Sequence, residues 1–347
     1  MTGFTPETDM ALLVAARGQG AESGLWRWTR GGAGWEGRLL AAAHDLSALA
    51  VHPVLPVVYA TAGEGAGRLL AWRLGPEGAD PVAALDTGGV EPAHLAIDPD
   101  GRVLLVANYG SSDLALWPLA ADGGVAGAPR IVPLSGRGPD PERQEAAHPH
   151  QILVRSDGVV VVVDLGADML REFRLDPAGP GLEPLRTQPL PPGSGPRHAV
   201  FLPDGRMAVA GELGNTLLVG AGQAWQTVPA TGLARAGHAR WARNYPGDIA
   251  LGPGGIVHLA NRSLCTLASF DPGGPVARLV GEIETGVEWP QHLLVLGDHV
   301  LVAGWDTGRV VAHPLRSGIP AAPQALFDCP GACWIAVFRS GQQELRG

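Results

Sequence analysis

The stretch EPAHLAIDPDGRVLLVANYG, residues 91–110, contains the unit from which this chain is built. A proline is followed by an apolar strand, an Asp-Gly pair, a second apolar strand and a polar residue. An Asp-Gly pair between two apolar runs is a strong short-range signal of a β-hairpin. The segment therefore predicts two neighbouring antiparallel strands.

The same pattern returns at intervals through the chain. Its opening prolines are Pro92, Pro149, Pro196, Pro246 and Pro290, with steps of 57, 47, 50 and 44 residues. A β-repeat with a period near 50 residues predicts a propeller. The later copies are HPHQILVRSDGVVVVVDLGAD (148–168), GPRHAVFLPDGRMAVAGELG (195–214), YPGDIALGPGGIVHLANR (245–262) and WPQHLLVLGDHVLVAGWD (289–306).

The two ends of the chain complete the repeat. Residues 11–18, 24–30 and 38–43 read as the second, third and fourth strands of a blade, and GACWIAVF (331–338) resembles the missing first strand. With a further blade from about Ser47, we predict an all-β, seven-bladed β-propeller closed by a C-terminal strand joining the N-terminal blade. We expect one domain over residues 1–347, with loops at 136–147 and 230–243.

Composition excludes several classes of function. The net charge of -9 argues against a nucleic-acid partner. No apolar run is long enough for a membrane span, and the first ten residues lack the pattern of a signal peptide. Cys265, Cys329 and Cys333 have no metal-ligand company, so we expect buried free thiols in a reducing compartment and no metal centre.

Polar residues recur where the first strand of a repeat starts and where the second strand ends. Because these strands are antiparallel, both sets should lie on one face, at the mouth of the propeller channel, where ligands commonly bind. The strand starts carry His94, His150 with Gln151, His198, Asp248 and His292. The strand ends carry Arg17, Asn108, Asp164, Glu212 and Asn261, and Arg262 follows the last of these.

Two interpretations of this polar ring stay open. A repeat can keep a polar residue as a buried hydrogen-bonding tie between neighbouring blades, which would be purely structural. Alternatively, the variation among His, Asp, Glu, Asn and Arg indicates a site assembled from different blades. A tie would tend to repeat one residue type.

The residue types of the ring suit the opening of an ester or a lactone. A carboxylate near a histidine can fix its tautomer and make it a better base, and an arginine can hold an anion or an oxyanion. No GxSxG, HExxH, CxxC or P-loop motif is present, so a serine hydrolase, a zinc protease and a nucleotide-binding loop are not supported.

The sequence resembles the lactonase family of seven-bladed propellers, whose best known members are bacterial 6-phosphogluconolactonases. The resemblance rests on VANYG (106–110), HPHQ (148–151), VDLGAD (163–168), GSGPRH (193–198), ELGNT (212–216) and LANR (259–262). It implies a cytoplasmic enzyme that hydrolyses a sugar lactone, with no cofactor. Matched motif by motif, it places the family's channel residues at His150, Asp164, Arg197, His198 and Glu212.

The expected activity is hydrolysis of a sugar lactone, with 6-phosphogluconolactone as the first candidate. We expect Glu212, His150 or His198 to activate water, Arg197 to hold the oxyanion or an anionic group, and Asp164 to orient a neighbouring histidine. The expected substrate-binding residues are Arg17, His94, Asn108, Asp248, Asn261, Arg262 and His292.

One departure from the family pattern bears on the substrate. The seventh repeat reads Pro290-Gln291-His292 where the family usually has Pro-Arg-Asp, which weakens the case for a phosphorylated substrate. The alternatives are therefore a hydrolase or cyclase of another lactone, such as a muconolactone, and a propeller that binds a partner without catalysis.

Overall fold

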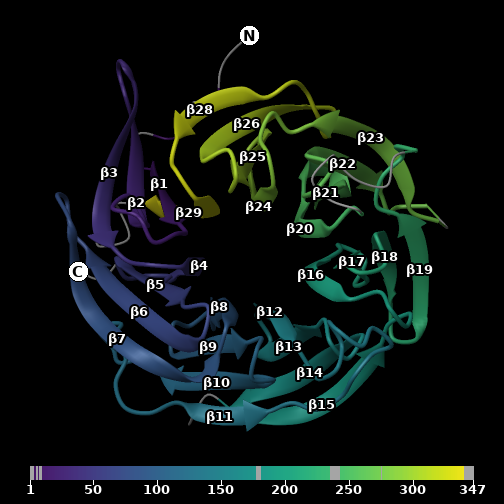
Figure 1. The fold of residues 1–347 in the computed structure, drawn as a ribbon, viewed down its shortest axis with the longest axis horizontal. Coiled ribbons are helices and arrows are strands. Elements are labelled where there is room, and N and C mark those ends of the chain that lie inside the picture. The colour runs from purple at the N-terminus through teal and green to yellow at the C-terminus, as the bar shows by residue number, and fades with distance from the viewer. Residues whose placement is uncertain are drawn as a thin grey trace. The chain divides into compact units, whose positions relative to one another are not determined.

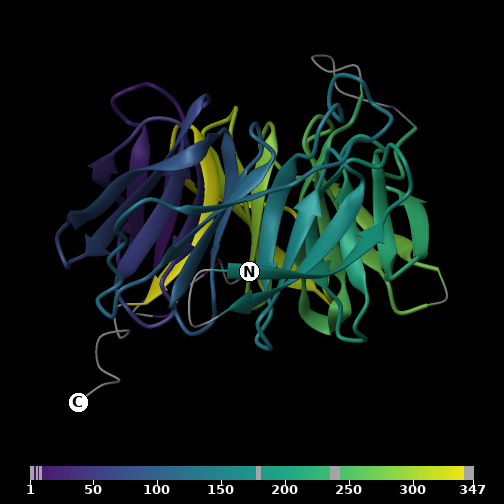
Figure 2. The same ribbon diagram turned by 90° about the horizontal axis from the view of Figure 1, so that it is seen from below.

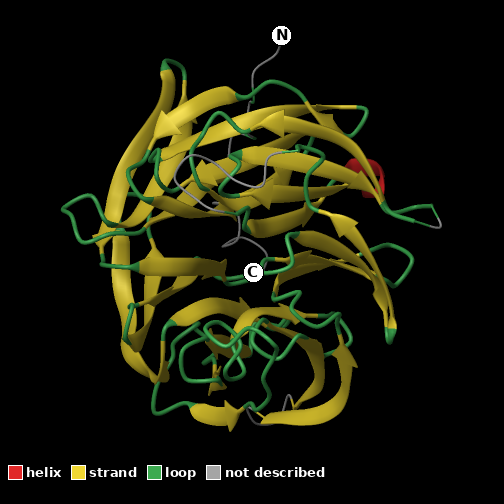
Figure 3. Cartoon of the chain, turned by 45° about the vertical axis from the view of Figure 1, so that its right-hand side comes forward, coloured by secondary structure: helices red, strands yellow, loops and turns green. Residues whose placement is uncertain are grey.

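The structure is a computed structural model that describes residues 4, 7, 10–176, 181–234, 243–274 and 276–339. These residues form strands and a single turn of 3-10 helix, η1 (Pro253–Gly255), which is the red element of Figure 3. The chain divides into two compact units. The larger unit is Pro6–Thr187 with Ala336–Gly347, and the smaller unit is Gln188–Ile335 with Met1–Thr5.

Four sheets contribute strands to the larger unit, and their labels can be followed in Figure 1. The first has the order β29 (Ala332–Arg339), β1 (Met10–Ala16), β2 (Gly24–Gly31), β3 (Gly34–Ala42). The second contains β4 (Leu46–Val51), β5 (Val57–Ala62), β6 (Ala66–Leu74) and β7 (Ala79–Val90). The third contains β8 (Pro92–Ile97), β9 (Val103–Asn108), β10 (Asp113–Pro118) and β11 (Arg130–Pro133). The fourth contains β12 (Pro149–Val154), β13 (Val159–Asp164), β14 (Met169–Asp176) and β15 (Gly181–Pro189).

Three sheets belong to the smaller unit. The first contains β16 (Pro196–Phe201), β17 (Met207–Gly211), β18 (Thr216–Ala221) and β19 (Ala224–Pro229). The second contains β20 (Pro246–Leu251), β21 (Val257–Asn261), β22 (Thr266–Asp271) and β23 (Arg278–Glu284). The third contains β24 (Pro290–Leu296), β25 (His299–Gly304), β26 (Arg309–Arg316) and β28 (Gln324–Asp328), with the short β27 (Ile319–Pro320) also paired to β26. Neighbouring strands within the sheets pair antiparallel, and Figure 2 shows the same ribbon turned by 90°.

The predicted turns between first and second strands are present. Gly101, Gly158 and Gly205 have φ angles of 70°, 80° and 86°. Only glycine adopts this left-handed region without a steric penalty, which explains why the Asp-Gly pairs recur. These turns set where the first strand ends and the second begins.

The apolar strand residues form the core between neighbouring sheets of a unit. In the larger unit, Val160 and Val162 of β13 pack with Val103 and Leu105 of β9. In the smaller unit, Ala208 and Ala210 of β17 belong to a cluster with Leu259 and Phe270 of the next sheet. Each sheet thus buries both faces, which requires apolar side chains on both sides of β9, β13 and β17.

The predicted strands at the chain ends are confirmed. The strand that the sequence placed at 331–338 is β29, and it stands beside β1 in a four-stranded sheet with β2 and β3. No strand lies between β11 and β12, as expected for the loop at 136–147. Part of the second expected loop, residues 235–242, lies outside the described residues. The single domain over 1–347 stays a prediction.

None of the three cysteines forms a disulfide, and not all of them are buried as predicted. Cys329 and Cys333 are buried, whereas Cys265 is partly exposed. Cys265 has a positive φ of 57° in the turn that follows β21, and a turn residue has less protein around it than a strand residue. Within the described ranges, no helix has the length and apolar character needed to cross a membrane.

Candidate active site

The register of the first two strands aligns the repeats residue by residue. The opening proline pairs with the last residue of the second strand: Pro92 with Asn108, and Pro149 with Asp164. We call the two residues after the proline the +1 and +2 positions, and the residue after the second strand the exit position. The +1 residues are Ala93, His150, Arg197, Gly247 and Gln291, the +2 residues are His94, Gln151, His198, Asp248 and His292, and the exit residues are Tyr109, Leu165, Glu212, Arg262 and Trp305.

This register corrects the alignment made from sequence. Asn108, Asp164 and Asn261 are the last residues of their second strands, whereas Glu212 and Arg17 stand one residue beyond, after Gly211 and Ala16. One residue along a strand turns a side chain to the opposite face. The polar residues that the sequence grouped as strand ends therefore belong to two different positions.

The five first strands that open with a proline, β8, β12, β16, β20 and β24, each have a β-bulge next to it. In β12, for example, the pairing steps from Pro149 to Gln151 on one strand while it advances by a single residue on the other. A bulge inserts one unpaired residue and redirects the neighbouring side chains, and bulges are frequent beside active sites. In β8, β12 and β24 the +1 side chain is partly exposed, and the +2 side chain is buried.

The +2 residues tie one first strand to the next. His94 Nδ1 accepts from the Ile152 amide at 3.4 Å, and His292 Nδ1 accepts from the Ile335 amide at 3.3 Å. Asp248 Oδ2 accepts from the amide of Leu293 at 2.7 Å. The sequence predicted that His94, Asp248 and His292 bind substrate. These contacts favour the other interpretation, in which a polar residue is a buried hydrogen-bonding tie between neighbouring strands.

His198 is the fully buried +2 residue of β16. Its Nδ1 donates to Asp248 Oδ1 at 2.7 Å, so Nε2 is the basic nitrogen. Burial, and then the Arg197 cation, lower the pKa of His198 to about 4. Burial alone would raise the pKa of Asp248, but His292 and His198 lower it below its usual range. At neutral pH a neutral histidine therefore donates to an ionised aspartate.

A second buried histidine, His258 of β21, adds to the pH dependence of stability. Its Nδ1 lies 2.9 Å from Ser269 Oγ, and burial followed by His313 lowers its pKa to about 4. An unfolded histidine has a pKa near 6.5, so between about pH 6.5 and 4 the unfolded chain binds the proton and the folded chain does not. Stability therefore falls as the pH falls through this window.

We expect the free energy of unfolding to drop by about 2 kcal/mol for each of His198 and His258 between pH 7 and pH 5. Urea unfolding at the two pH values measures this drop. The substitution His258→Gln should remove one histidine's share of the difference. An equal drop in this variant and in the natural chain would show that His258 does not contribute.

The asparagines at the ends of second strands hydrogen-bond within the protein. Asn108 is fully buried and its Nδ2 donates to Asp113 Oδ1 at 2.7 Å. Asn261 is also fully buried, and its Nδ2 donates to the Ala230 carbonyl at 2.9 Å. These contacts hold the turns that leave the strands. They support the structural alternative for both residues, which the sequence assigned to substrate positioning.

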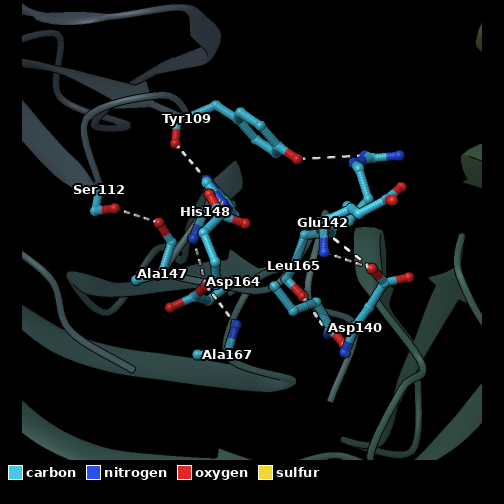
Figure 4. A network of polar contacts seen from close by, with 12 residues as sticks. Tyr109, Ser112, Asp140, Glu142, Ala147, His148, Asp164, Leu165 and Ala167 are labelled. Atoms are coloured by element: carbon cyan, nitrogen blue, oxygen red, sulfur yellow. Dashed lines mark hydrogen bonds and ion pairs between the residues drawn. The ribbon is translucent and has the colours of Figure 1, made fainter. Parts of the chain in front are cut away.

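Asp164 holds the end of the 136–147 loop, as Figure 4 shows. Its Oδ1 accepts from the amides of His148 at 2.9 Å and Ala167 at 3.0 Å, and its Oδ2 accepts from Arg171 Nε at 2.8 Å. The sequence placed this carboxylate beside a histidine ring. The structure instead places it on the backbone of His148, where it positions the chain.

The 136–147 loop is pinned by hydrogen bonds at several points (Figure 4). Asp140 Oδ1 accepts from the amides of Glu142 and Arg143, which closes a tight turn. Gln144 Nε2 donates to the Leu165 carbonyl at 2.8 Å, and Ser112 Oγ donates to the carbonyl of Ala147 at 2.5 Å. This irregular segment therefore has a defined conformation despite having no strand.

His150, predicted to be catalytic, lies beside aromatic and basic groups of the larger unit. The Tyr109 ring stacks on the His148 ring, with centroids 4.4 Å apart. It makes a T-shaped contact with the His150 ring, with centroids 5.6 Å apart. Arg143 Nη2 donates to the Tyr109 hydroxyl at 3.2 Å. His150 is partly exposed, as an acid–base residue must be to reach a substrate.

The smaller unit brings two arginines onto one carboxylate. Arg197 of β16 places Nε 3.3 Å from Glu212 Oε2, and Arg262, at the exit of β21, places Nη2 2.5 Å from the same oxygen. The three groups are almost completely buried. Arg197 is the +1 residue of β16, and Glu212 and Arg262 are the exit residues after β17 and β21. Two guanidiniums and one carboxylate leave one net positive charge, which suits a single anionic group.

Gly247 makes room for Arg262. A Cβ atom at Gly247 would lie 2.8 Å from Arg262 Cδ, so a larger residue would displace the arginine. The +1 residue of β20 is therefore a glycine, and the Arg262 side chain occupies the space that a side chain at this position would fill. Arg17, the exit residue after β1, is in a different setting, because it pairs with the exposed Glu64 at 2.9 Å.

Sequence reasoning did not single out the aromatic residues beside these charges. Trp289 and Tyr245 directly precede opening prolines, and Tyr109 is an exit residue. The signal was present, because the residue before the opening proline differs in every repeat. Among the described residues, no three His, Cys, Asp or Glu side chains form a cluster suited to a metal ion.

These features define a class of protein. A family model described as "Lactonase, 7-bladed beta-propeller" matches residues 32–325, so the chain belongs to the lactonase family of seven-bladed β-propellers. The seven sheets, with β29 beside β1, agree with this family, and the predicted fold class is confirmed.

Individual relatives narrow the comparison. The chain is 29% identical to a 6-phosphogluconolactonase of Bacillus subtilis over 239 residues, 64% of this chain and 66% of that protein. It is 31% identical to a probable 6-phosphogluconolactonase of Arthroderma benhamiae over 155 residues, 43% of this chain but only 39% of that protein. The matches thus span two fifths to two thirds of these relatives.

Solved structures share the fold over nearly the whole chain. A Lactobacillus plantarum protein superposes with a TM-score of 0.84 at 24% identity, covering 95% of this chain and 99% of that one. The periplasmic gluconolactonase PpgL of Pseudomonas aeruginosa superposes with a TM-score of 0.81 at 24% identity, covering 94% and 98%. At this level of identity the likeness concerns the fold.

Proposed function

We propose that this protein hydrolyses a sugar lactone, with 6-phosphogluconolactone as the first candidate substrate. The observation that carries the proposal is the placement of Arg197 and Arg262 on Glu212, at the +1 and exit positions of a lactonase-family fold. The curated relatives named 6-phosphogluconolactonase support the choice of substrate.

The reaction needs a water molecule, a proton acceptor and a group that stabilises negative charge. The water oxygen bonds to the lactone carbonyl carbon, and the carbonyl oxygen becomes an oxyanion. When the carbonyl re-forms, the ring C–O bond breaks and the ring oxygen leaves with a proton. The product is a hydroxy acid, whose ionisation releases one proton to the solution.

Arg197 is the proposed donor to the oxyanion. Its guanidinium is buried, and hydrogen bonds from a fixed cation in a site of low dielectric stabilise developing charge strongly. Glu212 holds Arg197 and Arg262 in place through one shared oxygen. It positions the two cations, because two adjacent positive charges disfavour the protonation that a general base must undergo.

The base that accepts the proton of water stays a prediction among Glu212, His150 and His198, because His150 lies in the larger unit and the two arginines lie in the smaller unit. Of the three predicted bases, His198 is committed to Asp248 and Glu212 to two arginines, whereas His150 is partly exposed in its own unit. A neutral imidazole can accept a proton from water, which is what a general base has to do.

Proton release tests the function directly. Purified protein mixed with δ-gluconolactone or its 6-phosphate should release protons faster than buffer or heat-denatured protein does. If His150 is the base, kcat/KM should fall as the pH falls and the imidazole becomes protonated. His150→Gln should lose this pH dependence together with most of the rate. No acceleration with either lactone would overturn the proposal and favour a binding propeller or another cyclic ester.

The cytoplasm is the proposed location. None of the three cysteines is in a disulfide, and proteins of reducing compartments rarely carry disulfides. Recovery of the protein in the periplasmic fraction of its cells would contradict this location.

A further inference from the structure

An aromatic pair flanks the Arg197, Glu212 and Arg262 cluster in the smaller unit. Tyr245 and Trp289 each precede the opening proline of a first strand, and their ring centroids are 6.3 Å apart at an angle of 45°. Both side chains are partly exposed. The pair therefore presents aromatic surface to solvent immediately beside buried charges.

Arg262 joins this pair to the charged cluster. Its Cζ lies 5.0 Å from the centroid of the Trp289 ring, and its Nε donates to the Tyr245 carbonyl at 3.2 Å. The same guanidinium reaches Glu212 through Nη2. A ligand bound on Trp289 and Tyr245 would therefore lie close to Arg262, the arginine that also pairs with Glu212.

Trp289 has a φ angle of 52°, in the left-handed region that bulky residues rarely adopt. The residue before the opening proline has a similar angle in other repeats, with a φ of 51° at Glu91 and of 54° at Gly195. The positive φ angle therefore belongs to this position of the repeat and is not specific to the aromatic residue.

The indole is held in one orientation. Its Nε1 donates to Gln291 Oε1 at 3.1 Å, so the +1 residue of β24 supports the ring. A neutral amide therefore orients the aromatic ring.

We propose that Trp289 and Tyr245 form a stacking subsite for the ring of the sugar lactone, an inference that rests on the proposed function. One face of such a ring presents C–H bonds, which carry partial positive charge. The face of an aromatic ring is negative and attracts such groups as it attracts cations. The subsite binds the ring, and the adjacent Arg262 and Arg197 receive the carbonyl or the product carboxylate.

Steady-state kinetics with δ-gluconolactone test the subsite. Trp289→Ala should raise KM about 10-fold and change kcat little, because stacking on the ring is made equally in the ground and transition states. Trp289→Phe should restore most of the affinity. Trp225→Ala is the matched control, since Trp225 of β19 is also partly exposed and donates to the Gly222 carbonyl at 3.1 Å.

A binding measurement separates this inference from the proposed function. Calorimetric titration with D-glucose, whose pyranose ring presents the same C–H face and has no ester to hydrolyse, should show weaker binding to Trp289→Ala and Tyr245→Ala than to the natural chain or Trp225→Ala. Unchanged KM and unchanged glucose affinity in both variants, with hydrolysis intact, would overturn the subsite and leave the function standing. Absence of hydrolysis in the natural chain would overturn the function, and glucose binding lost in Trp289→Ala would still support the subsite.

Discussion

Replacing Arg197 with methionine should lower kcat/KM for the lactone about 10²- to 10³-fold, the range seen when a single oxyanion donor is removed. Methionine fills a similar volume and removes the charge. Glu212 would keep Arg262 as its partner, so the carboxylate is not left buried without a cation. We therefore expect a small change in the free energy of unfolding beside the large change in rate.

Arg309→Met is the matched control for this experiment. Arg309 lies in the same unit, and its Nε pairs with Asp328 at 2.6 Å, but both side chains are substantially exposed. Such surface pairs contribute little to stability. An Arg197→Met variant that hydrolyses the lactone at the rate of Arg309→Met would remove Arg197 from the reaction.

Replacing Asp248 with alanine should lower the free energy of unfolding strongly, in contrast to the replacement of Arg197. Asp248 is buried and accepts from the Leu293 amide and from His198 Nδ1. Alanine would leave both donors buried without an acceptor. Losses of this kind cost about 3–5 kcal/mol of the free energy of unfolding, which denaturant titration would measure.

Asp248→Asn keeps an oxygen that can accept from Leu293 and serves if the alanine variant does not fold. It should be more stable than Asp248→Ala and less stable than the natural chain. Activity per folded molecule should stay within about threefold of the natural chain, since Asp248 belongs to the framework. A variant with full stability and no activity would return Asp248 to the substrate-binding set.

Much of the fold could be predicted from the repeat alone. The opening prolines and the Asp-Gly turns mark the first and second strands, and Gly158 and Gly205 have the positive φ angles that such turns require. The strand that completes the N-terminal sheet, β29, was visible because GACWIAVF follows Pro330 as first strands follow their prolines. These signals are local, so sequence displays them.

The site could be predicted only in part, because the strand register decides which position each polar residue occupies. Glu212 was grouped with Asn108 and Asn261, although it stands at the exit position and they end their strands. The repeat containing Glu212 has Gly211 at its strand end, so no polar side chain marked the boundary. The bulge beside each opening proline was equally invisible, since it is a property of strand pairing.

Sequence also could not separate framework from function within the polar ring. His94 and His150 both follow an opening proline, but His94 accepts a hydrogen bond from Ile152 while His150 is partly exposed beside Tyr109. The difference is one residue of register. It decides whether a side chain ties two strands together or remains available to a ligand.

We propose that Arg197 and Arg262 of the smaller unit contact the substrate, while the +2 residues and the residues that end the second strands hold the fold. A crystal structure of the protein soaked with the reaction product tests this most directly. We expect the product carboxylate within hydrogen-bonding distance of the Arg197 guanidinium. A carboxylate bound instead by His94, Asn108 or Asn261 would contradict it.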